Sequence, residues 1–173
     1  EFRKALSKKL NISPDNLLIG SGSTELIRMT AAVYFGPSDT VLIPQPTYGE
    51  YEISSRLVGA RVIKQQMKEE TDFRLDVVET EALVRRYRPK GMFMCNPNNP
   101  TGGYLPEKEF REILDIARDS LIIMDEAYAS FVSEGWSALG LVEQNNLIVI
   151  RSMTKDYALA GLRLGYLVAA RQV

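Results

Sequence analysis

Four consecutive residues near the C-terminal end, Ser152-Met153-Thr154-Lys155, place two hydroxyls beside an amine. A lysine amine can attach a carbonyl compound covalently, and hydroxyls can donate hydrogen bonds to phosphate oxygens. Arg163 adds a guanidinium, which can bind phosphate through two parallel hydrogen bonds. The segment therefore gathers two hydroxyls, an amine and a guanidinium, and does not by itself identify a ligand. Taken singly, Lys155 is typical of a solvated surface lysine and Arg163 of a surface ion pair.

A second candidate for phosphate binding is the glycine-rich segment Gly20-Ser21-Gly22-Ser23-Thr24-Glu25, which leads from an apolar run into a helical pattern. Glycines permit a tight turn, and the unbonded amides of Ser23 and Thr24 at a helix N-terminus would favour an anion. Ordinary capping is the alternative, because Ser21 or Ser23 could accept a bond from a first-turn amide.

Other polar segments also follow apolar runs. Asp125 follows Leu121 to Met124, and its carboxylate could pair with a protonated ring nitrogen or cap a helix. The loop from Asn96 to Gly102 consists of turn-forming residues, which make a rigid turn whose amides can be aimed at a ligand. Tyr48 and Tyr128 could present their rings to the same ligand or belong to the core.

Such segments need a scaffold that brings them together, and the apolar runs predict one. We expect seven strands, at residues 17–19, 41–43, 61–63, 92–95, 121–124, 147–150 and 164–169. Helical spacing predicts helices at residues 23–34, 48–57, 76–87 and 107–118. Residues 64–74 are interpreted as a polar connection of ordinary length.

Alternating strands and helices predict an α/β fold with three α/β/α layers around a mainly parallel seven-stranded sheet. In such sheets, ligands bind beyond the carboxyl ends of the strands. Because the polar segments follow the predicted strands, we expect them to meet at one edge of the sheet.

The composition limits the class of protein. A chain of 173 residues with 45% hydrophobic residues and a net charge of -1 is typical of one globular domain, and it favours neither nucleic acid nor a membrane as partner. The one cysteine, Cys95, ends the apolar run from Met92, so we expect a buried thiol and a reducing cytoplasm. No signal peptide, membrane span or metal site is predicted.

From Gly20 to Tyr166, the order and residues of these segments resemble fold-type-I pyridoxal-phosphate enzymes of the class I/II aminotransferase family. The resemblance lies in the branch of histidinol-phosphate aminotransferase and threonine-phosphate decarboxylase. It implies pyridoxal 5'-phosphate as cofactor, held by Lys155 as a Schiff base. It also implies that Asp125 keeps the ring nitrogen protonated, which lets the ring draw electrons from a carbanion.

The resemblance assigns the remaining site residues as well. Asn99 and Tyr128 would hydrogen-bond the phenolic oxygen of the cofactor, with Lys155, Asp125 and Tyr128 forming the catalytic set. Tyr48 would stack on the ring. The phosphate would be held by five residues: Ser23, Thr24, Ser152, Thr154 and Arg163.

Two substrates remain open at this point. The position of Thr24 is often aspartate, and that of Thr154 often serine, in histidinol-phosphate enzymes. Residues 23–27, Cys95 and residues 151–155 also resemble threonine-phosphate decarboxylases. A third possibility is the ligand-sensing domain of a transcription regulator, which would need a DNA-binding helix-turn-helix that this sequence does not show.

The resemblance further implies that residues 1–173 are the large, cofactor-binding domain. An N-terminal segment and a C-terminal small domain, which would carry the arginine for the substrate carboxylate, are expected outside the sequence. We therefore expect an aminotransferase that uses an amino acid and a 2-oxo acid and forms a homodimer at full length. The sequence as given would be inactive alone.

Overall fold

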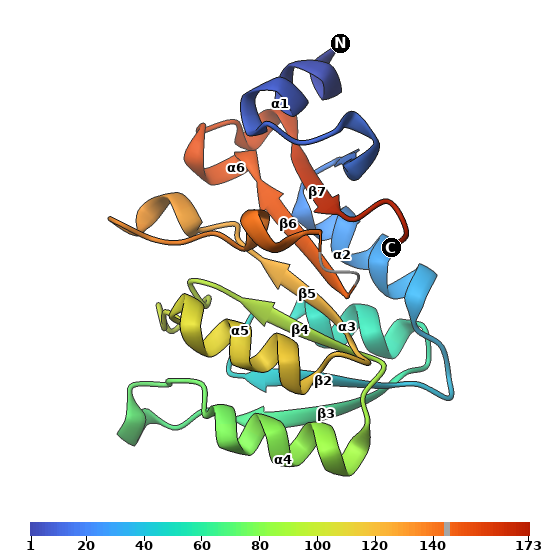
Figure 1. The fold of residues 1–173 in the computed structure, drawn as a ribbon, viewed down its shortest axis with the longest axis vertical. Coiled ribbons are helices and arrows are strands. Elements are labelled where there is room, and N and C mark those ends of the chain that lie inside the picture. Colours follow the sequence, from blue (N-terminus) through green and yellow to red (C-terminus); the bar gives the residue numbers. More distant parts are fainter. Residues whose placement is uncertain (144–145) are drawn as a thin grey trace.

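Seven strands form one mixed sheet in the part of the chain that the computed structural model describes, residues 1–143 and 146–173. The strands are β1 (Leu17–Gly20), β2 (Thr40–Gln45), β3 (Arg61–Gln66), β4 (Gly91–Cys95), β5 (Leu121–Asp125), β6 (Leu147–Ser152) and β7 (Gly165–Ala169). Their order across the sheet is β1-β7-β6-β5-β4-β2-β3 (Figure 1). The predicted number and sequence positions of the strands are confirmed.

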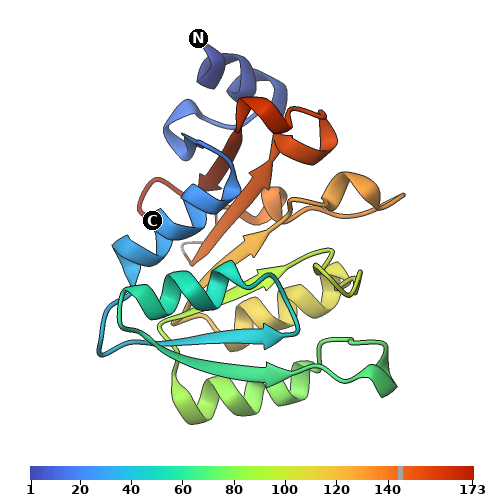
Figure 2. The same cartoon turned by 180° about the vertical axis from the view of Figure 1, so that it is seen from behind.

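Helices cover both faces of the sheet. They are α1 (Phe2–Leu10), α2 (Ser23–Tyr34), α3 (Glu50–Leu57), α4 (Val77–Tyr87), α5 (Glu107–Ile116) and α6 (Met153–Asp156). Figures 1 and 2 show α4 and α5 on one face and α2 and α3 on the other. Short 3₁₀ turns occur at Pro14–Asn16, Glu69–Thr71, Ala129–Phe131, Ala138–Leu141 and Ala160–Leu162. The predicted three-layer α/β/α architecture is confirmed.

Side chains of the central strands alternate between two apolar cores. In β5, Ile122 and Met124 pack with Phe110 of α5, whereas Ile123 packs with Leu26 of α2. Because successive strand side chains point to opposite faces, a run that is apolar throughout belongs to a strand covered on both sides. This is why the continuous apolar runs predicted the strands well.

One strand departs from the parallel arrangement. β7 runs antiparallel to both of its neighbours, β1 and β6, whereas β2 to β6 pair in parallel. The start of β7 therefore lies where β1 and β6 end, and Gly165 pairs with both Gly20 and Ser152. The register places the glycine-rich turn after β1 beside the hydroxyl segment after β6.

Two sequence interpretations need correction. The first three residues of the predicted connection 64–74 belong to β3, where Lys64 pairs with Ile43 of β2. The polar residues of this segment hid the strand from the sequence pattern. Lys64 and Gln66 are exposed, and the buried residue between them, Gln65, is also polar. The helix predicted from Tyr48 begins at Glu50, so Tyr48 lies in the turn that precedes α3.

Candidate functional site

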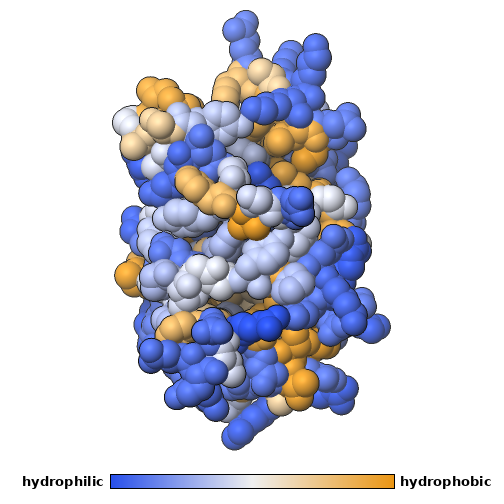
Figure 3. All heavy atoms as spheres, turned by 90° about the vertical axis from the view of Figure 1, so that its left-hand side faces the viewer, coloured by the Kyte–Doolittle hydropathy of each residue, from blue (hydrophilic) through white to orange (hydrophobic). Residues whose placement is uncertain are grey.

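A cavity opens at the carboxyl ends of β4, β5 and β6. All ten site residues predicted from the sequence line it: Ser23, Thr24, Tyr48, Asn99, Asp125, Tyr128, Ser152, Thr154, Lys155 and Arg163. Figure 3 looks onto this edge of the molecule, where hydrophilic residues predominate and hydrophobic ones are scattered. Five separate segments thus converge on one site, as expected from a sheet of this type.

One end of the cavity has the features of an anion cradle. Gly22 precedes α2 with a φ of 85°, and no side chain caps the helix there. The capping alternative for the serines is therefore not realised, and the amide of Ser21 is bonded instead to Glu25 Oε2 at 2.6 Å. A Cβ at Gly22 would lie 2.9 Å from Nη2 of Arg163, so the guanidinium rests directly against this turn.

The other hydroxyls of the cradle come from β6 and α6. Ser152 Oγ accepts a bond from the amide of Thr154 at 3.2 Å, which fixes the turn that begins α6. The hydroxyl proton of Ser152 remains available for an acceptor in the cavity. Together with the free helix N-terminus of α2, this donor set suits a dianionic phosphate.

The carboxylate of Asp125 is 3% exposed at the end of β5. Its Oδ2 accepts a bond from the hydroxyl of Tyr51 at 2.8 Å, and its Oδ1 accepts one from the amide of Ala127 at 2.9 Å. Burial raises the pKa of Asp125 to about 6, and both hydrogen bonds oppose that rise. Since no ion pair to Asp125 occurs among the described residues, a cationic N–H in the cavity would relieve its burial.

Aromatic rings and the amine border the same space. Lys155 is exposed, and its Nζ lies 5.9 Å from the ring centroid of Tyr128. The hydroxyl of Tyr48 is 3.3 Å from Oγ1 of Thr24, and its ring meets that of Tyr51 edge-on, with centroids 5.6 Å apart. The cavity therefore combines a free amine with half-buried aromatic rings.

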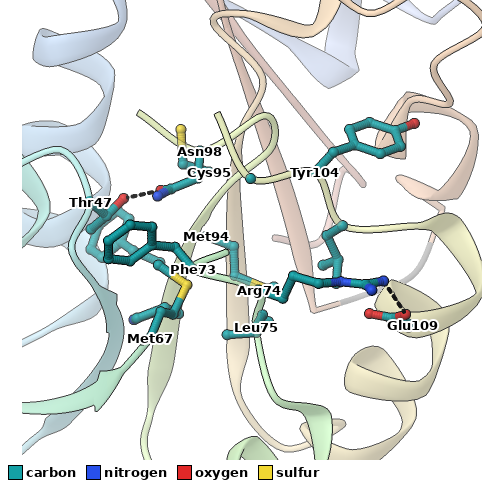
Figure 4. Close-up of a pocket in the computed structure, with 14 residues that line it drawn as sticks. Thr47, Met67, Phe73, Arg74, Leu75, Met94, Cys95, Asn98, Tyr104 and Glu109 are labelled. Carbon is teal, nitrogen blue, oxygen red and sulfur yellow. Dashed lines mark hydrogen bonds and ion pairs between the residues drawn. The ribbon is translucent and has the colours of Figure 1, made fainter. Parts of the chain in front are cut away.

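The asparagine loop is held from its far side. Asn98 Oδ1 accepts a bond from Thr47 Oγ1 at 2.7 Å, drawn as a dashed line in Figure 4, and Asn98 Nδ2 donates to the carbonyl of Pro46 at 2.9 Å. Asn98 and Cys95 line a neighbouring, mostly apolar cavity, which Figure 4 shows, whereas Asn99 lines the candidate site. Asn98 thus anchors the loop and leaves Asn99 to face the site.

A buried ion pair lies directly behind the site. Arg151 donates through Nε and Nη2 to Oε2 of Glu126, at 2.9 and 2.7 Å. Glu126 also accepts bonds from Ser137 Oγ at 2.8 Å and from the amide of Ala138 at 2.6 Å. Because Glu126 follows Asp125 and Arg151 precedes Ser152, the pair fixes the ends of β5 and β6 relative to each other.

Sequence reasoning missed three residues that line the cavity: Tyr51, Cys95 and Ala127. Cys95 was predicted only as a buried thiol; the structure leaves it partly buried, and desolvation raises the pKa of its thiol to about 12. Tyr51 stands three residues after Tyr48, and this spacing at the start of a helix could have suggested that both rings face the same way. No local signal identified Ala127, because its contribution is a backbone amide.

A model of the family described as aminotransferase class I and II matches residues 1–173. The histidinol-phosphate aminotransferase of Caldanaerobacter subterraneus subsp. tengcongensis is 35% identical over 174 residues, which cover 100% of this chain and 48% of that protein. The chain thus spans about half the length of the curated relatives it matches.

Solved structures agree in fold. Histidinol-phosphate aminotransferase from Sinorhizobium meliloti, in complex with pyridoxal-5'-phosphate, superposes with a TM-score of 0.89 at 25% identity, over 98% of this chain and 46% of that one. L-threonine-O-3-phosphate decarboxylase from Porphyromonas gingivalis gives a TM-score of 0.81 at 26% identity, over 98% and 49%. Among the described residues, no helix is long and apolar enough to cross a membrane.

Proposed function

Because this chain belongs to the class I and II aminotransferase family, we propose that residues 1–173 form the cofactor-binding domain of a pyridoxal-phosphate-dependent aminotransferase. The amino donor that we propose is a phosphorylated amino compound such as histidinol phosphate, with a 2-oxo acid as acceptor. The observation that carries this proposal is the convergence of an amine, a buried carboxylate and an anion cradle in one cavity.

The residues present fit the proposed cofactor. The uncapped turn at Gly22, against which Arg163 rests, suits its phosphate, and the unpaired carboxylate of Asp125 suits a protonated ring nitrogen. When bound, the cofactor supplies an electron sink for negative charge that develops at the α carbon of the substrate. Lys155 would hold the cofactor covalently and, once its amine is released, would move the proton at that carbon.

The other side chains orient the cofactor. Tyr48 would cover the face of its ring, and Asn99 and Tyr128 would donate hydrogen bonds to its phenolic oxygen. The phosphate is held by Ser23, Thr24, Ser152, Thr154 and Arg163, whose donors come from three segments of the chain. The proposed roles leave substrate selection to residues elsewhere in the protein.

A product assay on the protein that carries this chain tests the reaction. With histidinol phosphate and 2-oxoglutarate, we expect glutamate to form. The alternative is a decarboxylase acting on threonine phosphate, which is favoured by the similarity to the Porphyromonas gingivalis enzyme. Release of carbon dioxide from threonine phosphate without an acceptor, and no glutamate from the first mixture, would reject the transferase in favour of that alternative.

Gly22→Ala is expected to weaken binding of pyridoxal phosphate by about tenfold or more, because a side chain at positive φ costs about 1–2 kcal/mol and would displace Arg163. An absorbance titration with the cofactor measures the change. Gly59→Ala is a matched control, since Gly59 also has a positive φ, of 81°, but does not line the cavity. Equal affinities in both variants would contradict the cradle.

Asp125→Asn is expected to stabilise the cofactor-free protein at pH 7.5 by roughly 1–3 kcal/mol. The folded-state pKa of Asp125, about 6, lies above its ordinary value, so the folded protein favours the protonated carboxyl. The stability of the unmodified protein therefore falls as pH rises through 6. Asparagine has no charge to bury, so the gain should vanish near pH 4.

Thermal unfolding at the two pH values, without cofactor, measures the effect of Asp125→Asn. The exposed Asp119, replaced in the same way, should change stability little at either pH. If Asp125→Asn is less stable than the unmodified protein at pH 7.5, the charge of Asp125 is compensated within the folded protein and the prediction is wrong. With cofactor added, we expect the order of stability to reverse.

We also propose that the protein works in the reducing cytoplasm and as a homodimer. The free, partly buried thiol of Cys95 suits a reducing compartment. The dimer follows from the family resemblance, in which the active site takes residues from both subunits. Sedimentation equilibrium at micromolar concentration tests it, and a monomer that binds cofactor with full affinity would speak against shared sites.

A further inference from the structure

Tyr51 is a fully buried tyrosine of α3 whose polar end reaches the candidate site. Its ring is 0% exposed and stacks on Phe93 of β4, with centroids 5.1 Å apart and planes inclined by 7°. Packing of this kind leaves the ring a single orientation. The phenolic oxygen is thereby fixed at the cavity wall, where it donates to Oδ2 of Asp125 at 2.8 Å.

Building on the proposed function, we propose that Tyr51 is a positioning residue that holds the carboxylate of Asp125 in place to meet the ring nitrogen of the cofactor. The Ala127 amide binds Oδ1 and the Tyr51 hydroxyl binds Oδ2, so the carboxylate cannot rotate without breaking a bond. Each oxygen keeps a second lone pair for a donor in the cavity.

The same side chain also supports a second wall of the cavity. The ring of Tyr51 contacts that of Tyr48 edge-on, at 5.6 Å and 84°. Tyr48 is the residue proposed to cover the cofactor ring. Tyr51 therefore contacts both the ring of Tyr48 and the carboxylate of Asp125, and so fixes their relative positions. It lies in the helical layer, whereas Asp125 lies in the sheet.

The charge state of Asp125 gives this role a measurable signature. Burial is the main cause of its raised pKa, and the Tyr51 bond acts in the opposite direction by stabilising the charged form. Other titratable groups around Asp125 come from several elements: Cys95 from β4, the neighbouring Glu126, and Tyr48, Tyr128, Lys155 and Arg163 across the cavity. A variant that changes only the Tyr51 hydroxyl leaves all of these in place.

The test is a titration of the Asp125 carboxyl by carbon NMR in cofactor-free protein labelled at aspartate, with Asp125→Asn identifying the signal. In Tyr51→Phe the ring packing remains and the donor is lost, so we expect the pKa of Asp125 to rise by about one unit. Tyr166→Phe is the matched control, because Tyr166 is also buried but belongs to β7 and does not line the cavity.

A second measurement covers the case in which Tyr51→Phe does not fold. Site-specific 3-fluorotyrosine at position 51 keeps the hydroxyl and makes it a stronger donor, so the pKa of Asp125 should fall. An unchanged Asp125 titration in both forms, or an equal shift in Tyr166→Phe, overturns the proposal. Because neither cofactor nor substrate is present, these results are independent of the product assay that tests the proposed function.

Discussion

Lys155→Ala is expected to abolish borohydride trapping of pyridoxal phosphate at the candidate site and to lower turnover by roughly 10⁴-fold. Both effects have one cause, since no other lysine lines the cavity in the described part of the chain. The amine lies within the same space as the carboxylate of Asp125 and the cradle at Gly22. The proposed cofactor, bound between these two ends, would have its reactive carbon within the same cavity as this amine.

Mass spectrometry of the reduced, digested protein locates the trapped adduct. The matched control is Lys108→Ala on α5, which removes an exposed lysine far from the cavity lining and should leave trapping unchanged. An adduct that persists at the same yield in Lys155→Ala, on another residue of the site, would refute the assignment. Cofactor affinity without the covalent bond should remain measurable, because the phosphate donors are untouched.

Disruption of the buried ion pair between Glu126 and Arg151 is expected to destabilise the protein strongly. Replacing either residue alone, as Glu126→Leu or Arg151→Met, should lower the free energy of unfolding by about 3–5 kcal/mol. The side chains are only 3% and 17% exposed, so the remaining partner would be a buried charge without its counter-ion. The double variant should regain most of the loss, because it buries apolar groups in place of two charges.

Urea unfolding of the four proteins gives the double-mutant cycle. The surface pair of Arg111 and Glu107 on α5 serves as the control, since Arg111→Ala should cost no more than about 0.5 kcal/mol. If each single variant of the buried pair loses less than about 1 kcal/mol, the pair is solvated and does not fix the strand ends. We further expect the stable double variant to bind cofactor more weakly, because Ser137 and Ala138 also lose their acceptor on Glu126.

Patterns within short stretches predicted most of this fold and the residues that line the cavity. Runs such as Leu121 to Met124 are apolar on both sides and therefore identify covered strands. A mainly parallel sheet then brings the following segments to one edge, which is why Asp125 and Lys155 meet although 30 residues separate them. The Lys64–Gln66 portion of β3 was not predicted as strand. Its residues are polar, and it is a strand because it pairs with β2.

The supporting contacts could not be predicted, because they depend on neighbours across the sheet. Glu126 and Arg151 look like ordinary charged residues until β5 and β6 are known to be adjacent, with Asp125 paired to Ile150. Tyr51 donates to a carboxylate 74 residues further along the chain, and the sequence contains no sign of that bond. Residue types and local spacing thus indicate which side chains could contact a ligand. The contacts that fix those side chains depend on long-range packing.

The antiparallel insertion of β7 has a consequence for synthesis of the protein. β1 leaves the ribosome before β2 to β7, yet its pairing partner in the described residues is β7, so Gly20 cannot pair until Gly165 has been synthesised. Until then, the edge of β1 stays open, and the glycine turn has neither Arg163 nor the end of β6 beside it. A nascent chain released before β7 has emerged cannot complete the anion cradle. The cradle can therefore form only after β7 has been synthesised and has paired with β1 and β6.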